Sequence, residues 1–167
     1  METSWLSLLP SRPCHRLLLA APLIFVAHVA EEAPGFVPWV NAHIDRDITQ
    51  AAFWTVNITG LLLTLAVVLF EWLSRSKVSA TVALAWLGFV MVGNAVLHAA
   101  GALVDRAYAP GVVTALFLYV PFSTWVIASA VRTRRLSAFT ATIAVVLGSL
   151  PMLAHGYMIL FRGTRLF

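Results

Sequence analysis

Apolar residues fill five long stretches of this sequence, and short polar turns separate the stretches. Each stretch is close to the ~20 residues that an α-helix needs to cross ~30 Å of hydrocarbon. We see no internal repeat and no segment with the composition of a separate soluble domain. The pattern predicts an all-α, polytopic membrane protein, a compact bundle of five transmembrane helices forming a single domain over residues 1–167. The expected spans are residues 17–33, 51–73, 78–104, 112–131 and 136–161.

The composition agrees with a membrane location and excludes several function classes. Hydrophobic residues make up 60% of the chain and charged residues 11%, with a mean hydropathy of +0.89. So few charges could not cover a water-soluble domain of 167 residues. The net charge of +4 does not indicate nucleic-acid binding, because the basic residues lie in short clusters between apolar stretches. The only cysteine, Cys14, excludes an internal disulfide and a cysteine-rich metal site.

The basic clusters predict the orientation of the chain in the membrane. Lys and Arg collect in cytoplasmic loops, and here three basic clusters alternate with loops in which acidic residues offset each Arg. We therefore expect a cytoplasmic N-terminus, insertion in the cytoplasmic (inner) membrane and an extracytoplasmic C-terminus, although Arg162 and Arg165 oppose the last assignment. The clusters are Arg12 with Arg16, Arg75 with Lys77, and Arg132 with Arg134 and Arg135.

A cleavable signal peptide is the alternative interpretation of the first stretch, since basic residues precede it. Cleavage after Ala30 or Ala33 would place His28 or Glu31 at the third position before the cut. Small residues are preferred at that position, so we expect the stretch to remain as a helix.

Three ionisable groups interrupt the end of the first stretch, in the run His28-Val29-Ala30-Glu31-Glu32. At the bilayer centre each acidic residue costs roughly 2.5–3.5 kcal/mol, whereas each strongly apolar residue returns only about 0.3–0.6 kcal/mol. The two glutamates could cancel most of the insertion energy of this segment. We therefore expect them to have partners inside the protein.

Polar residues of four predicted helices lie at one depth, in the outer half of the membrane. At ~100° per residue, His28 and Glu32 share one helix face, and Asn94 and His98 share another. Polar groups gathered at one depth are typical of an intramembrane functional site. The residues at this depth are His28, Asn57, Asn94, His98 and His155.

At these residues the chain resembles the HXXEE domain family of small bacterial integral membrane proteins, which is named for the motif found here at residues 28–32. A second family-like element is Asn94-x-x-x-His98, and His155 would complete the set. The resemblance extends over most of the chain. It implies a membrane protein with this set of polar residues, and it implies no particular reaction.

The same residue types bind transition metals. Imidazoles and carboxylates are ligands of zinc, iron and manganese, and three protein ligands with an open position are typical of a catalytic ion. A two-metal site needs about four carboxylates, so we expect one divalent ion. Whichever of Glu31 and Glu32 is not a ligand would act as a general base, and Asn94 would orient a ligand or an intermediate. The expected metal ligands are His28, Glu32, His98 and His155.

Structural roles are the alternative for these residues. His28 could form salt bridges with the glutamates, or the charged groups could reach the membrane interface. Asn94 and His98 could hydrogen-bond between helices. We expect Glu71 and Asp105 to be interfacial, because both lie at predicted helix ends.

The loop between the first two spans carries His43, Asp45 and Asp47. These residues could suggest a second metal site, but we expect Asp45 or Asp47 to cap the second helix. Phe36 and Trp39 suggest a segment that lies on the membrane surface and could roof the site.

Three function classes fit these observations. The preferred one is a metal-dependent hydrolase or oxidoreductase that acts on a lipid-like or other apolar small molecule. The second is a metal-free acid/base isomerase or cyclase of an isoprenoid or sterol-like substrate, and the third is a metal-ion or proton carrier or binding protein. The sequence contains no Gly-x-Ser-x-Gly, phosphate-loop or Cys-x-x-Cys motif. The expected partners are the lipid bilayer and the substrate, and a homo-oligomer is compatible with the sequence.

Overall fold

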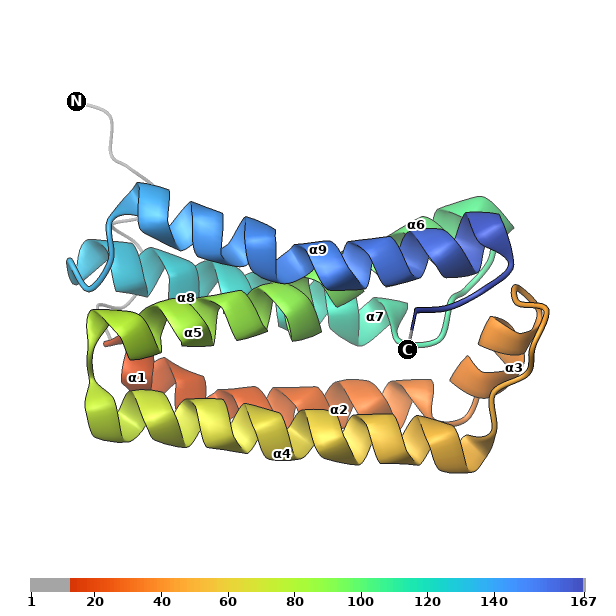
Figure 1. The fold of residues 1–167 in the computed structure, drawn as a ribbon, viewed down its shortest axis with the longest axis horizontal. Coiled ribbons are helices and arrows are strands. Elements are labelled where there is room, and N and C mark those ends of the chain that lie inside the picture. The colour runs from red at the N-terminus through yellow and green to blue at the C-terminus, as the bar shows by residue number, and fades with distance from the viewer. Residues whose placement is uncertain (1–12, 167) are drawn as a thin grey trace.

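The computed structural model describes residues 13–166, and these form helices joined by short connections, without a β-strand in that range. The long helices lie side by side in one bundle (Figure 1). The segments in chain order are α1 (Cys14–Leu17), η2 (Leu18–Ala20), α2 (Ala21–Glu32), α3 (Phe36–Asn41), α4 (Gln50–Ser74), α5 (Lys77–Leu87), η3 (Gly88–Gly93), α6 (Asn94–Asp105), α7 (Val112–Thr114), η4 (Ala115–Tyr119), α8 (Val120–Arg132) and α9 (Ala138–Arg162).

Five helical units are long and apolar enough to cross a membrane, which is the number that the hydropathy pattern predicted. Three of the units are composite, because α1, η2 and α2 follow one another without a break, as do α5, η3 and α6, and α7, η4 and α8. The chain is therefore an all-α membrane protein. The five units are Cys14–Glu32, Gln50–Ser74, Lys77–Asp105, Val112–Arg132 and Ala138–Arg162.

Hydroxyl side chains cap the N-termini of three helices. Thr49 accepts a hydrogen bond from the backbone amide of Ala52 and caps α4, and Ser137 caps α9 in the same way. Ser76 caps α5 through a reciprocal capping box with Ser79. The expectation that Asp45 or Asp47 caps the second span is wrong, because α4 begins at Gln50 and Thr49 stands at the capping position.

Glycines allow the last span to pack closely against the middle of the third. α9 lies along α5 and η3 (Figure 1). A methyl group added at Gly148 would overlap the backbone of Ala85, and one added at Gly88 would overlap the backbone of Val145. Small residues at such crossings let membrane helices approach until their backbones touch. The third span is consequently the central element of the bundle, with 56% of its most apolar window buried.

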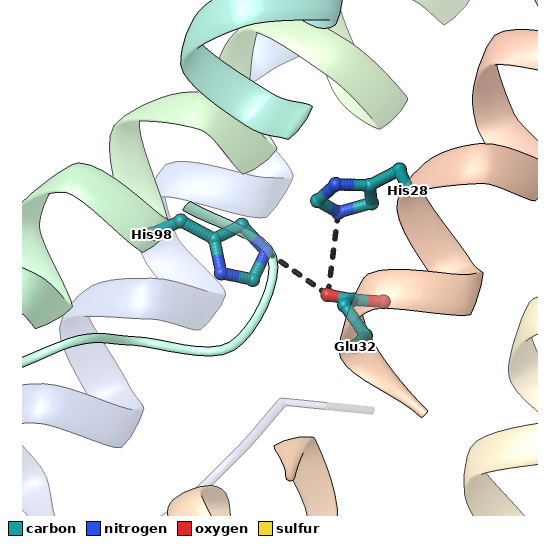
Figure 2. A group of neighbouring side chains, drawn as sticks. All are labelled: His28, Glu32 and His98. Atoms are coloured by element: carbon teal, nitrogen blue, oxygen red, sulfur yellow. Dashed lines mark ion pairs between the residues drawn. The ribbon is translucent and has the colours of Figure 1, made fainter. Parts of the chain in front are cut away.

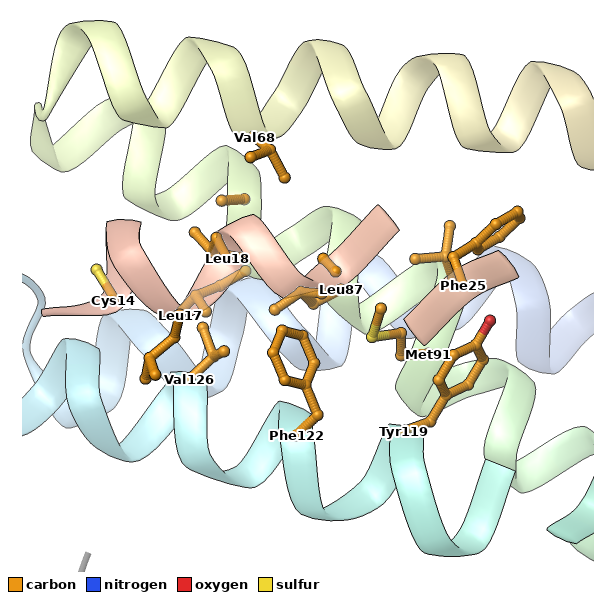
Figure 3. Close-up of a cluster of buried hydrophobic side chains, with 14 of the residues drawn as sticks. Cys14, Leu17, Leu18, Phe25, Val68, Leu87, Met91, Tyr119, Phe122 and Val126 are labelled. Atoms are coloured by element: carbon orange, nitrogen blue, oxygen red, sulfur yellow. The ribbon is translucent and has the colours of Figure 1, made fainter. Parts of the chain in front are cut away.

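Two π-helical segments interrupt the spans next to polar residues. η3 ends immediately before Asn94, and η4 begins immediately after Thr114. A π turn accommodates an extra residue, and such turns occur often at functional sites. A cluster of buried apolar side chains fills the bundle along the first span, from Cys14 to Phe25 (Figure 3). Met91 and Tyr119 lie at the Phe25 end of this cluster.

The opposite end of the bundle contains a buried ion pair. The Glu71 side chain is fully buried, and Arg135 Nη2 lies 3.0 Å from its Oε1. The Ser79 hydroxyl donates to Oε2, and the Cys14 thiol lies 3.9 Å from Oε1. This carboxylate, in the last turn of α4, joins α1, α4, α5 and the connection before α9. The expectation that Glu71 is interfacial stays a prediction.

Arg135→Ala should lower the free energy of unfolding by on the order of 3 kcal/mol, because Glu71 would stay buried without its cation. Denaturant unfolding in detergent measures the change. Lys77→Ala, at an exposed position of the same end, is the control and should have little effect. The double variant Arg135→Leu with Glu71→Gln should recover part of the loss. Equal losses in the single and double variants would show that the ion pair is not the cause.

Candidate metal centre

Three buried donor atoms from two helices meet at the other end of the bundle. His28 and Glu32 lie one turn apart on α2, and His98 lies on α6. The Glu32 carboxylate oxygen Oε1 is 3.3 Å from His28 Nε2 and 2.9 Å from His98 Nε2 (Figure 2). The three ligand atoms all lie within 4.8 Å of one another, and the side chains are at most 5% exposed. We call these three residues the His-Glu-His cluster.

The orientation of His28 is fixed by a chain of hydrogen bonds. The Thr114 hydroxyl lies 2.5 Å from Glu31 Oε2 and 2.8 Å from His28 Nδ1. A hydroxyl has one hydrogen and an ionised carboxylate only accepts, so Thr114 donates to Glu31 and accepts from the Nδ1–H of His28. In the neutral imidazole the other ring nitrogen, Nε2, then keeps its lone pair. It faces Glu32 Oε1 and lies 3.0 Å from the amide nitrogen of Asn94.

His98 is the least satisfied polar side chain of the cluster. It is fully buried, and neither of its ring nitrogens forms a hydrogen bond with any residue that the structure describes. The contact between Nε2 and Glu32 Oε1 is short, at 2.9 Å, but it does not have the direction of an N–H donor. Buried polar groups without a partner cost about 1–3 kcal/mol each.

Glu31 points away from the cluster and has a different role. Its carboxylate accepts hydrogen bonds from the Tyr108 hydroxyl at 2.7 Å and from the backbone amides of Val113 at 3.1 Å and Thr114 at 2.7 Å. These amides begin the fourth span, where free N–H groups and the helix dipole favour an anion. Burial and the Glu31 carboxylate raise the pKa of Tyr108. The structure thus separates the two glutamates: Glu32 joins the cluster, and Glu31 caps a neighbouring helix.

Asn94 and His155 lie beside the cluster. Asn94 Nδ2 lies 3.0 Å from His28 Nε2. His155 is not one of the three converging donors, and its Nδ1 accepts a hydrogen bond from the backbone amide of Leu166. Its predicted role as a metal ligand stays a prediction. His155, Asn94 and Glu32 do line one cavity of about 120 Å³.

Two residues that shape the centre, Gly111 and Tyr119, were not among the residues expected from the sequence. Gly111, at φ +93°, passes so close that an added methyl group would lie 2.8 Å from His98, 2.9 Å from Glu32 and 2.9 Å from His28. The Tyr119 ring stacks on His28 with 4.3 Å between centroids, and its buried hydroxyl has no partner among the described residues. A Pro-Gly pair such as Pro110-Gly111 is typical of a turn, but this pattern does not indicate which side chains the backbone of the turn will contact.

The short helix α3 covers the centre, which is the position that the sequence suggested for Phe36 and Trp39. The Phe36 ring lies 6.0 Å from that of His98, and Trp39 packs on Gly101 of α6. Trp39 Nε1 donates to Asp105 at 2.7 Å, and His43 Nε2 lies 2.9 Å from the same carboxylate. His43 Nδ1 also donates to the Trp39 carbonyl.

His43 and Asp105 therefore tie the segment after α3 to the end of α6. Partial burial opposes protonation, but hydrogen bonds to the Trp39 carbonyl and to Asp105 raise the pKa of His43. Both ring nitrogens face acceptors, which favours the charged imidazolium. Asp105 stands at the end of α6, where it holds α3 over the centre through Trp39 and His43.

Gly111→Ala should destabilise the protein more than the strain of its backbone alone, because the new methyl group overlaps all three members of the cluster. Gly163→Ala is the matched control, since Gly163 also has a positive φ, of +66°, but its added methyl group would only reach ordinary contact with Asp45. Positive φ by itself costs about 1–2 kcal/mol. Unfolding measurements should show a clearly larger loss for Gly111→Ala, and equal losses would rule out a contact with the cluster.

Comparison with protein families identifies the chain. The family described as "Protein of unknown function with HXXEE motif" matches residues 19–126. The match includes the whole His-Glu-His cluster and Asn94, and it ends before His155. No curated protein and no solved structure matches the chain. Because the match covers more than half of the sequence, the chain belongs to the HXXEE-motif family of proteins of unknown function.

Proposed function

We propose that this protein is a membrane-embedded metalloenzyme in which His28, Glu32 and His98 hold one divalent ion. The observation that supports this most is the buried convergence of two imidazole nitrogens on one carboxylate oxygen, at 3.3 and 2.9 Å. Atoms bound to one ion at about 2.0–2.2 Å lie at similar separations from one another. The cavity beside Glu32 and Asn94 supplies room for a substrate.

The hydrogen bonds around the cluster match those of a metal ligand shell. His28 presents the lone pair of Nε2 to Glu32 Oε1, and two acceptors that face each other repel unless a proton or a cation lies between them. The other nitrogen of His28 is held through Thr114 by Glu31. Ligand histidines are commonly oriented in this way by a carboxylate or a hydroxyl behind them.

Two histidines and one carboxylate form the ligand set of both hydrolytic zinc sites and oxygen-activating iron(II) sites. A bound ion would supply a Lewis acid that polarises a substrate oxygen or makes bound water acidic. The second oxygen of Glu32 has no hydrogen-bond partner among residues 13–166, so it can accept a proton. Asn94 borders both His28 and the cavity, and its amide can orient a polar group of the substrate.

The substrate class follows from the surroundings of the centre. The cavity next to Glu32 is lined mainly by apolar side chains, among them Phe53, Leu97 and Met152. The centre lies within the helix bundle, one turn or less from the ends of the spans that carry Glu32 and Thr114. We propose that the enzyme sits in the cytoplasmic membrane with its N-terminus inside, so that the cavity opens in the outer leaflet to a lipid-like molecule.

A metal-free acid/base enzyme is the second candidate. The observation in its favour is that Glu32 Oε1 already contacts both imidazoles, so a proton could pass between His28 and His98 through the carboxylate. An isomerase or cyclase of an isoprenoid or sterol-like molecule needs such a donor and acceptor pair. Metal content separates this candidate from the first.

Protein purified without chelator should contain about one equivalent of a divalent metal ion, zinc, iron or manganese, by elemental analysis. His28→Ala and His98→Ala should each abolish it, because two remaining donors hold an ion poorly. His15→Ala, at the far end of the first span, is the control and should retain the ion. His155→Ala should also retain it, since His155 lies outside the cluster.

Wild-type protein that stays folded but neither contains nor takes up metal would remove the metalloenzyme proposal. The metal-free candidate would then be favoured. Loss of metal in His155→Ala as well as in the cluster variants would place His155 among the ligands.

Thr114→Val should weaken metal affinity by about 10–100-fold without abolishing it, because the ligand His28 would lose the group that fixes its ring. Valine matches threonine in shape and removes only the hydroxyl. Thr124→Val, on the same span but exposed, is the control. Competition with a metal-sensing dye measures the affinity, and an unchanged affinity for Thr114→Val would show that the hydroxyl does not orient a ligand.

A further inference from the structure

Two cavities adjoin one another beside the candidate metal centre, and together we call them the groove. The first, of about 120 Å³, is bordered by Glu32. The second, of about 290 Å³, lies further along α4 toward its C-terminal end, between α4 and the third span. The residues that line both are Val56, Asn57, Asn94 and Met152. Because they share these walls, one ligand can occupy both cavities.

The groove has the length of one leaflet. Along α4 the first cavity begins at Ala52 and the second ends at Leu63. At 1.5 Å per residue, this stretch of helix is about 16 Å long. That is about half of the ~30 Å hydrocarbon thickness. A groove of this length fits an extended chain that enters from one leaflet.

The second cavity of the groove is apolar. Its walls include Phe25, Leu63, Trp86, Phe89 and Val90. Leu63 is 46% exposed, and it stands on the membrane-facing helix α4, only 17% of whose most apolar window is buried. A chain can therefore reach this part of the groove sideways from the lipid, without crossing water.

The outer end of the groove carries a positive charge. Arg165 lines the first cavity and forms no ion pair with any residue from 13 to 166. His155 lines the same cavity and accepts a hydrogen bond from the Leu166 amide through Nδ1. The guanidinium of Arg165 favours a carboxylate or a phosphate.

We propose that the groove binds a single-chain lipid with an anionic head group, with the head at Arg165 and the chain along α4 past Val56. This deepens the proposed function and rests on it for the chemistry, because the groove passes Glu32 and Asn94 between its two ends. The atoms that face the centre are then the first carbons after the head group, and these are the atoms that the enzyme would transform.

Direct binding to the detergent-solubilised protein tests the chain-binding part of the groove. Radiolabelled palmitate should bind the wild type with saturation. Val56→Trp and Leu63→Trp, which put an indole into the shared wall and the second cavity, should each weaken binding at least tenfold. Leu62→Trp is the matched control, since Leu62 lies on the same helix, is 60% exposed and lines neither cavity, and its binding should be unchanged. Equal binding by all three variants would overturn the groove assignment.

The head-group assignment is tested with a variant that removes the charge of Arg165 and with a lipid whose head group is uncharged. Arg165→Gln should weaken palmitate and hexadecyl phosphate by about tenfold, the loss expected for a charged hydrogen bond, and should leave hexadecanol unchanged. Arg162→Gln, also exposed but outside the lining of the cavity, is the control. Inorganic phosphate should not displace palmitate. Displacement by phosphate, or an equal loss for hexadecanol, would overturn the assignment of an anionic lipid.

Parallel metal analysis separates this proposal from the function on which it rests. His98→Ala should lose metal and still bind palmitate, because His98 does not line the groove. Wild-type protein that binds metal but no palmitate contradicts the lipid site alone. Groove-dependent palmitate binding by a protein that takes up no metal contradicts the metalloenzyme alone.

Discussion

The Glu32 carboxylate lies between two imidazoles in an apolar interior. The packing of the surrounding helices depends on this arrangement and holds it in place. A carboxylate in hydrocarbon is costly unless it is paired, and Glu32 is paired with residues from the first and third spans. Close contact between these spans is required for the pairing. Gly111, just before the fourth span, packs against the cluster as well, because a residue without a side chain fits against all three of its members. Glu31 adds a second constraint by holding the start of the fourth span beside His28.

Two buried carboxylates, Glu71 and Glu32, lie at opposite ends of the bundle and have different partners. The partners suggest a structural role for the first and a chemical role for the second. Glu71 is paired with a guanidinium, which stays charged at any physiological pH, and with hydroxyl and thiol groups. Such a pair holds helix ends together, and its guanidinium does not release a proton. Glu32 is paired with imidazoles, which can release protons and bind metals near neutral pH. Of these two carboxylates, Glu32 lines the cavity of about 120 Å³ and Glu71 does not, which supports the proposal that chemistry takes place at the Glu32 end.

The sequence was sufficient for the spans and for most of the centre. Long apolar stretches specify membrane helices almost independently of tertiary contacts, since each helix satisfies its own backbone. His28, Glu32 and His98 could be grouped because ionisable residues at one membrane depth have few alternatives to one another. The roles of the adjacent glutamates could not be divided, because residues one position apart are rotated by ~100° and the choice of face depends on the neighbouring helices. His155 is at the right depth, but rotation about α9 directs it to the hydrogen bond with Leu166. The contact of Gly111 with the cluster depends on a loop conformation that no periodic pattern records.

Anomalous X-ray diffraction, recorded above and below the absorption edge of the bound metal, tests the central claim most directly. Crystals of protein purified without chelator and supplied with zinc, iron(II) or manganese would serve. The account predicts one strong anomalous peak within about 2.0–2.2 Å of His28 Nε2, Glu32 Oε1 and His98 Nε2, with an open position toward the cavity. A well-ordered centre without an anomalous peak, in which a proton joins Glu32 to the two imidazoles, would contradict the claim that this cluster binds a metal ion.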